Sequence, residues 1–359
     1  MLLSDSPHIE DVRENRLLGR WAALLPRDPR QVGRVHESDA ELWPLGDGRL
    51  LALTVDTVCE EVDLGLYRTP FTAGRTAAVA ALSDLAAVGA DPVGLLLSVG
   101  LPPHDTVSVQ EGVARGAADA CTEAGTFVLG GDTNTSVRLC VGGTGVGLVP
   151  EGEALRRVGM RAGDLLYASG PLGLGSALAA ARWSGLPDGL FAESEYRPRV
   201  CLRFGRALRG IASACMDTSD GLVATLDQLA RLNRVAIRID RPLEELLAPR
   251  VEAVRRELGL PAFALLAGHH GEFELVFAVP PGRRDALEEA AARLVWRPLL
   301  LGRVEAGSGL AVGGRAVDGA RVRNLLEDVG GDPREYIRAM SRWGFDYAET
   351  STEPPSSTV

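Results

Sequence analysis

Apolar residues alternate along the chain between short continuous runs, which are typical of strands, and longer runs at helical spacing. In the first 150 residues, the strand-like runs are residues 49–58, 95–99, 127–129 and 139–149. Helical spacing is found before the first run, over residues 10–35, and between later runs, over residues 73–89 and 107–124. Since strands and helices alternate, we expect an α/β fold, and the short connections favour antiparallel pairing.

The same pattern starts again near residue 150. A strand predicted over residues 165–169 is followed by the glycine-rich turn 170–176 and an alanine-rich helix. Further strands are predicted at 235–239 and 275–279, and helices at 222–229 and 283–294. We therefore predict two domains, residues 1–150 and 151–347. The Ser-, Thr- and Pro-rich segment 348–359 is expected to be a disordered tail.

Composition narrows the choice of function. The 359 residues are 46% apolar and carry a net charge of −10, which disfavours a general nucleic-acid binder. No apolar run is long enough for a membrane span, and the first residues lack a signal-like segment, so we expect a cytoplasmic protein without a membrane partner. The five cysteines are scattered without metal-like spacing, which favours free thiols in a reducing compartment.

Aspartates beside small or hydroxyl residues recur in short segments along the chain. The segments are Thr54–Thr57, Leu82–Leu85, Gly130–Thr133 and Met216–Leu222, and Asp39 follows Ser38 in a fifth. Such carboxylates suit Mg²⁺, which prefers oxygen ligands and commonly shares them with phosphate. Asp84 or Asp132 alone would more simply be a helix cap or turn residue. The ordered set favours a site that handles a nucleotide through magnesium.

Signals for other phosphate sites are weak. The sequence lacks the Gly-x-x-x-x-Gly-Lys-Ser/Thr pattern, so charge neutralisation would have to come from metal and arginine. The turn 170–176 before a helix could cradle a phosphate, but such turns are more often simple connections. The adjacent His269 and His270 have no neighbouring zinc-ligand pattern, and we interpret them as loop or acceptor-pocket residues.

The order and spacing of these motifs resemble the thiamine-monophosphate kinase family, a branch of the aminoimidazole-ribonucleotide synthetase superfamily. The strongest matches are Ser83–Pro92, Gly130–Thr133 and Asp217–Leu222, and the resemblance extends from about Leu17 to Tyr347. It implies a two-domain α/β fold whose N-terminal sheet domain forms a homodimer. It also implies that ATP, as co-substrate, and Mg²⁺ bind between the domains and that a small-molecule acceptor is phosphorylated.

The resemblance also implies roles for individual residues. The implied magnesium ligands are Asp39, Thr54, Asp56, Asp84, Asp132 and Asp217. The implied ATP contacts are Gly130, Gly131, Arg157 and Ser219. Asp220 and Asp132 would be catalytic, and the acceptor side would be formed by Asp63, Asp220, Glu272 and Phe345. For Asp63, a solvated loop carboxylate is an equally good interpretation, and Phe345 could instead pack in the core.

Departures from the family pattern concentrate at the acceptor. Asp63 replaces a histidine, Gly271 replaces a glutamate and Phe345 replaces a tyrosine, each of which contacts thiamine phosphate in the family. At the metal positions only Ser38 replaces a carboxylate. A decaying enzyme would lose metal ligands at least as readily as acceptor contacts. We therefore hypothesise an active ATP-dependent phosphotransferase with a different acceptor.

Three alternatives stay open. The protein could be a genuine thiamine-monophosphate kinase with unusual contacts. It could be an ATP-dependent ligase or cyclase that uses an acyl or amide phosphate. A nucleotide-binding partner protein without chemistry is the third, although retention of Asp220 argues against it.

Overall fold

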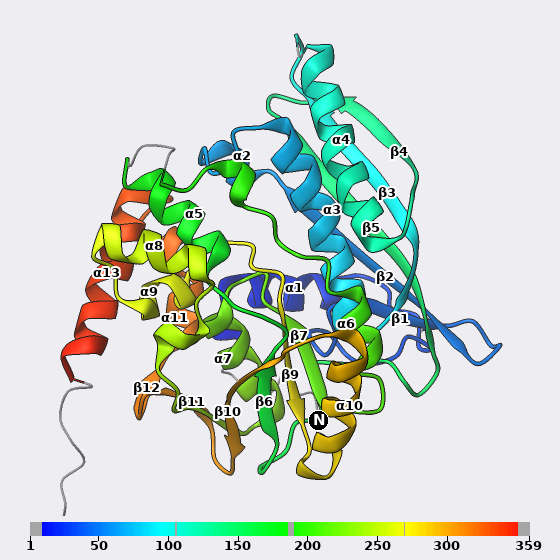
Figure 1. The fold of residues 1–359 in the computed structure, drawn as a ribbon. Coiled ribbons are helices and arrows are strands. Elements are labelled where there is room, and N and C mark those ends of the chain that lie inside the picture. Colours follow the sequence, from blue (N-terminus) through cyan, green and yellow to red (C-terminus); the bar gives the residue numbers. More distant parts are fainter. Residues whose placement is uncertain (1–8, 105, 186–189, 269, 351–359) are drawn as a thin grey trace, which may run out of the picture.

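A computed structural model describes residues 9–104, 106–185, 190–268 and 270–350, and the side chains of residues 344–350 lie outside that description (Figure 1). The fold is α/β with two sheets, as the sequence predicts. Among the described helices, none has the length and apolar character needed to cross a lipid bilayer. All five cysteines are free.

The first half of the chain builds a five-stranded sheet in the order β1-β2-β5-β3-β4. Its strands are β1 Glu41–Pro44, β2 Arg49–Val58, β3 Asp91–Leu101, β4 Val128–Thr135 and β5 Cys140–Pro150. The helices of this half are η2 Ile9–Asp11, α1 Arg13–Leu24, α2 Glu60–Asp63, α3 Pro70–Ala87 and α4 Val107–Ala124. Neighbouring strands are antiparallel except for the parallel pair β3 and β4. Helices α3 and α4 pack side by side, and α3 lies on β2 and β5 (Figure 1).

The second half builds a seven-stranded sheet in the order β12-β11-β8-β10-β6-β9-β7. Its strands are β6 Leu165–Ala168, β7 Ala214–Asp217, β8 Ala236–Ile239, β9 Leu275–Val279, β10 Leu299–Glu305, β11 Gly309–Val312 and β12 Arg315–Val317. Its α-helices are α5 Leu174–Trp183, α6 Leu202–Ala207, α7 Leu222–Asn233, α8 Pro249–Leu258, α9 Ala262–Ala267, α10 Arg284–Leu294, α11 Gly319–Arg323, α12 Leu325–Asp328 and α13 Pro333–Thr350. Short 3₁₀ helices are η3 Glu193–Glu195, η4 Leu243–Leu246 and η5 Pro281–Arg283.

Helix α3 joins the two halves. It begins at Pro70, and the Thr69 hydroxyl caps it by accepting the amide of Thr72 across 3.2 Å. Glycines in β5 let the sheet approach it, because a Cβ on Gly143 would lie 2.6 Å from the carbonyl oxygen of Ala77. The opposite side of α3 contacts α6 and β7 from the second half. Residues near the end of α3 are therefore held between the two sheets.

Three expectations from the sequence need adjustment. The helix predicted over residues 10–35 ends at Leu24, since Pro26 and Pro29 cannot continue it. The strand predicted at 127–129 continues to Thr135, so the Gly130–Thr133 motif lies within β4 and not in a loop. Helix α13 includes residues 348–350 of the predicted tail, and residues 351–359 lie outside the described range.

Candidate metal and nucleotide site

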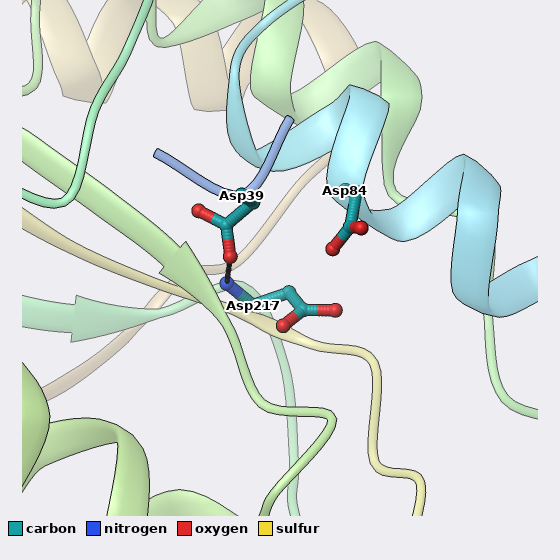
Figure 2. A group of neighbouring side chains, drawn as sticks. All are labelled: Asp39, Asp84 and Asp217. Carbon is teal, nitrogen blue, oxygen red and sulfur yellow. Dashed lines mark hydrogen bonds between the residues drawn. The ribbon is translucent and has the colours of Figure 1, made fainter. Parts of the chain in front are cut away.

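Three aspartates from distant parts of the chain meet where the two halves join (Figure 2). Asp39 comes from the segment before β1, Asp84 from the last turn of α3, and Asp217 from the end of β7. One carboxylate oxygen from each lies within 4.8 Å of the others. Residues 178 positions apart are thereby placed in one group, since the amide of Asp217 approaches Oδ1 of Asp39 at 3.5 Å. We refer to these three residues as the acid cluster.

Hydrogen bonds fix the orientation of Asp217. The hydroxyl of Ser83 donates to its Oδ2 across 2.7 Å, and the hydroxyl of Ser219 donates to its Oδ1 across 3.0 Å. The amide of Ser219 donates to the same Oδ1 at 3.3 Å. Ser83 belongs to the segment Leu82–Leu85 and Ser219 to the segment Met216–Leu222, so two of the predicted motifs help to hold this carboxylate.

The remaining members of the predicted metal set on β2 adjoin the acid cluster. Thr54 donates its hydroxyl to Oδ2 of Asp84. Asp56, two residues further along β2, interacts with the charges of Asp220 and Asp39. Arg157 contacts the cluster from the other side, with Nη2 3.0 Å from Oδ1 of Asp39. The structure therefore brings together five of the six predicted metal residues, together with Arg157 and Ser219.

The carboxylates are held in an environment that disfavours their charge. Burial, and then the charge of Asp39, raises the pKa of Asp217 to about 7. Burial and the charges of Asp56 and Asp217 raise the pKa of Asp84 well above its usual range. Burial lowers the pKa of Arg157, but the neighbouring aspartates more than reverse this effect and keep the guanidinium charged. One arginine is thus shared by several close carboxylates.

A divalent cation fits this arrangement. Oδ2 of Asp39 and Oδ2 of Asp56 are buried and have no hydrogen-bond partner among the described residues. Unpaired buried acceptors of this kind are costly unless something neutralises them. All the donor atoms are hard oxygens, which suit Mg²⁺. Asp39, Asp56, Asp84 and Asp217, with the Thr54 hydroxyl, are the residues that would hold it.

A cavity of about 280 Å³ opens beside the acid cluster. Asp56, Asp84 and Arg157 line it, as do the predicted ATP and acceptor residues Ser219 and Asp220. Aromatic side chains line the same cavity, namely Tyr67, Trp183, His270 and Phe273. A charged end for phosphates and an apolar wall for an organic group thus share one space.

Arg323 and Glu14 are charged residues at the cavity that were not predicted from the sequence. Arg323, at the end of α11, places its Nε 3.0 Å from Oδ1 of Asp220 and donates from Nη2 to Glu14 across 2.6 Å. Both Arg323 and Glu14 line the cavity. They are 309 residues apart and lie in helices without a motif, so the pattern of the sequence carried no signal for them.

Asp132, Gly130 and Gly131 are not brought to the acid cluster within the described chain. All three are exposed on β4, the outer strand of the five-stranded sheet. Gly131 has a structural reason to be glycine, since a Cβ there would lie 2.1 Å from the carbonyl oxygen of Leu97 in β3. None of the three lines the cavity described above.

The acceptor residues predicted from the resemblance are also mostly elsewhere. Asp63 pairs with Arg138 and does not line the cavity. Glu272 is buried, and its Oε1 accepts the amide of Leu174 across 2.9 Å at the start of α5. Glu272 is therefore not shown at the acceptor side. Its carboxylate also occupies the start of α5, where the turn 170–176 could have held a phosphate.

The remaining acceptor residues are only partly described. The side chain of Phe345 and the whole of His269 lie outside the described residues. His270 is buried, and its ring packs edge-on against Trp183 with the centroids 4.8 Å apart. Asp220 is therefore placed at the cavity, and His270, which was interpreted as a loop or acceptor-pocket residue, also lines it.

Family models and individual relatives of this chain point to the same protein family. Residues 37–149 match the family described as AIR synthase related protein, N-terminal domain, and residues 161–314 match its C-terminal domain. A thiamine-monophosphate kinase of Caulobacter vibrioides is 33% identical over 281 residues, covering 76% of this chain and 79% of that protein. A selenide, water dikinase of Burkholderia ambifaria is 33% identical over 215 residues, covering 58% of each chain.

Solved structures agree with these relatives. The protein tt0281 from Thermus thermophilus superposes with a TM-score of 0.74 at 31% identity, covering 86% of this chain and 99% of that one. A structure described as AaThiL complexed with AMPPCP and TMP has a TM-score of 0.68 at 27% identity, covering 80% of this chain and 90% of that one.

Proposed function

The chain belongs to the thiamine-monophosphate kinase family, within the AIR synthase related proteins, and we propose that it phosphorylates an acceptor other than thiamine monophosphate. It is an ATP-dependent kinase that uses Mg²⁺. The main structural support for catalysis is that Asp39, Asp84 and Asp217 come together beside a cavity. Phosphoryl transfer depends mainly on positioning and charge neutralisation, and this site offers both.

The residues divide the work as follows. The acid cluster would hold Mg²⁺, which would supply positive charge against the phosphates of ATP. Arg157 and Ser219, which contact members of the acid cluster, would also contact the nucleotide phosphates. Asp220 faces the cavity with Arg323 beside it, so an acceptor hydroxyl or phosphate bound there would meet both a carboxylate and a guanidinium. Arg323 would stabilise charge on the transferred group.

A changed acceptor is supported by the residues that replace the family's contacts. Asp63 is paired with Arg138 and is not at the cavity. Gly271 has a φ of +56°, and a Cβ there would lie 2.5 Å from the Tyr196 hydroxyl oxygen and 3.1 Å from that of Tyr67. The space into which a side chain at position 271 would extend is therefore filled by tyrosines. Among the relatives, the selenide, water dikinase has a different acceptor by name, so a change of acceptor has a parallel.

Kinetics of the purified protein with Mg²⁺, ATP and thiamine monophosphate tests this proposal directly. We expect Mg²⁺-dependent binding of AMPPCP but turnover of thiamine monophosphate far below the usual 1–100 s⁻¹ of kinases. Efficient formation of thiamine diphosphate would refute the change of acceptor. Analysis of the products with an acceptor panel separates a kinase from a ligase or cyclase, because only the latter releases free phosphate together with a new bond.

We also propose that residues 1–150 form a dimerisation domain and that the partner is a second copy of this chain. Apolar side chains on the five-stranded sheet are exposed, among them Leu53, Val55, Leu96, Val128 and Leu129. An exposed apolar sheet surface of this kind is typical of an interface. Light scattering after size-exclusion chromatography should give twice the chain mass of 38.0 kDa, and Val55→Asp should give the monomer. A monomeric wild-type protein would contradict the dimer.

A further inference from the structure

The cavity beside the acid cluster has a rigid aromatic wall. The hydroxyls of Tyr67 and Tyr196 are 3.0 Å apart, and the two rings are stacked with their centroids 5.5 Å apart. The indole nitrogen of Trp183 donates to the carbonyl oxygen of Leu64 across 3.1 Å. Because these contacts tie the rings to the protein, Tyr67 and Trp183 are fixed parts of the cavity lining.

Glu61 adds a carboxylate to the lining of this cavity. Its Oε2 is buried and has no hydrogen-bond partner among the described residues. The residue itself is well anchored, since its carbonyl oxygen accepts the amides of Leu66 at 2.8 Å and Tyr67 at 3.1 Å. Burial raises the pKa of the Glu61 carboxyl. An anchored buried acceptor without a partner is unfavourable in the empty cavity.

The neighbouring arginines are already committed to other carboxylates. Arg138 pairs with Asp63, and Arg157 pairs with Asp39. Arg323 pairs with both Asp220 and Glu14. Within the described chain, no ion pair reaches Glu61, so a positive partner for this carboxylate would have to come with a ligand.

We propose that Glu61 binds a protonated amine of the acceptor, which donates an N–H hydrogen bond to the Glu61 carboxylate, while the end of the acceptor that receives the phosphoryl group reaches the acid cluster. This assignment rests on the proposed kinase function. An ammonium group supplies both the missing donor and the missing charge. The aromatic rings of Tyr67 and Trp183 in the lining suit the same chemistry, since aromatic rings attract cations. Glu61 thereby favours acceptors that carry a positive charge at the end that is not phosphorylated.

Binding of a matched pair of probes tests the assignment. Benzylamine and benzyl alcohol have nearly the same shape, but only the amine is protonated at pH 7.5. Their affinities are measured by calorimetry with the full-length protein, both without nucleotide and saturated with Mg²⁺ and AMPPCP. We expect wild-type protein to prefer the amine by more than about tenfold. Glu61→Gln, which keeps the shape, should abolish this preference, and Glu257→Gln, at an exposed position that does not line the cavity, should keep it.

Other outcomes would overturn the assignment. These are equal affinity of wild-type protein for the two probes, no binding of either probe, an undiminished preference in Glu61→Gln, or an equal loss in Glu257→Gln. Binding of Mg²⁺ and AMPPCP reports on the kinase function separately, because Glu61 is not among the residues that hold the nucleotide. Thermal unfolding controls for the fold, and Glu61→Gln should melt at the same or a higher temperature, since it removes a buried unpaired carboxylate.

Discussion

The hydroxyl of Ser83 in α3 donates a hydrogen bond to Oδ2 of Asp217 at the end of β7, with the two oxygens 2.7 Å apart. The bond spans 134 positions of the sequence and joins the two halves of the molecule. Asp84 is the next residue along α3. The position of Asp217 relative to Asp84 is therefore set by this one hydroxyl together with Ser219.

Ser83→Ala should weaken the metal site more than the fold. Asp217 would lose a donor to its carboxylate, and hydrogen bonds to charged groups contribute about 1.5–3 kcal/mol. We expect the dissociation constant for Mg²⁺, measured by calorimetry, to rise by about tenfold or more. Ser308→Ala, at an exposed loop position, serves as the control. Unchanged Mg²⁺ affinity in Ser83→Ala would show that Asp217 is not a ligand.

Asp84→Asn and Asp132→Asn should have different effects on Mn²⁺ binding. Asp84→Asn removes a member of the acid cluster, so we expect loss of both Mn²⁺ binding without nucleotide and turnover. In the register of the sheet, Asp56 lies opposite Gly143, Gly143 opposite Leu97, and Leu97 opposite Gly131. Three steps of about 4.8 Å place Gly131 about 14 Å from Asp56, and Asp132 is the next residue along β4, so Asp56 and Asp132 are too far apart to share one ion.

Asp132→Asn should therefore leave Mn²⁺ binding to the acid cluster intact, as measured by electron paramagnetic resonance of free Mn²⁺. It should lower turnover with ATP, if the predicted role of Asp132 in holding nucleotide-bound metal is correct. Weakened Mn²⁺ binding in Asp132→Asn without nucleotide would contradict the separation of about 14 Å. Normal turnover would remove Asp132 from the catalytic residues.

Arg323→Gln should reduce turnover more than nucleotide affinity. The guanidinium lies against Asp220 and Glu14 at the cavity, where charge would develop on the transferred phosphoryl group in the proposed reaction. We expect kcat to fall by about 10²-fold or more while the KM for ATP changes little. A change confined to KM would instead assign Arg323 to ground-state binding. The exposed Arg334→Gln provides a matched control for loss of one positive charge.

Part of this fold could be predicted from its sequence, because several of the strands and helices have a strong local pattern. Strand β2 and helix α4 begin and end where the apolar pattern predicts. The helix predicted over residues 10–35 was too long, because its apolar spacing was followed past Pro26 and Pro29. Order of the strands was not predictable in this way, since pairing depends on contacts between distant segments.

The acid cluster was predictable for a different reason. A carboxylate next to a buried strand needs a partner, and Asp56 and Asp217 both follow apolar runs, so their types and positions carried a signal. Glu14, Glu61 and Arg323 carried none, because charged residues in helices are ordinarily on solvated faces. Their importance arises from the cavity that forms only when both halves pack. Glu272 shows the converse error, since its motif position suggested substrate contact although its carboxylate caps α5.

Glu272 provides a test of this capping assignment through pH. Burial raises the pKa of Glu272 to about 7 from the ordinary value of 4.5, despite the amides at the start of α5. Below pH 4.5 the group is protonated in both folded and unfolded chains and contributes no pH dependence. Between these two values the folded protein keeps a proton that the unfolded chain releases. Stability of the wild-type protein therefore falls as pH rises towards 7 and then levels off.

Glu272→Gln should remove this part of the pH dependence while keeping an oxygen that can accept the Leu174 amide. The free energy of unfolding of the variant minus that of wild type should increase between about pH 5 and pH 8, by up to about 3 kcal/mol. Urea unfolding at both pH values in EDTA measures the difference and keeps metal bound to the acid cluster from contributing. The exposed Glu257→Gln should show no such change. An equal difference at both pH values would mean that Glu272 stays ionised in the fold and that burial does not govern its charge.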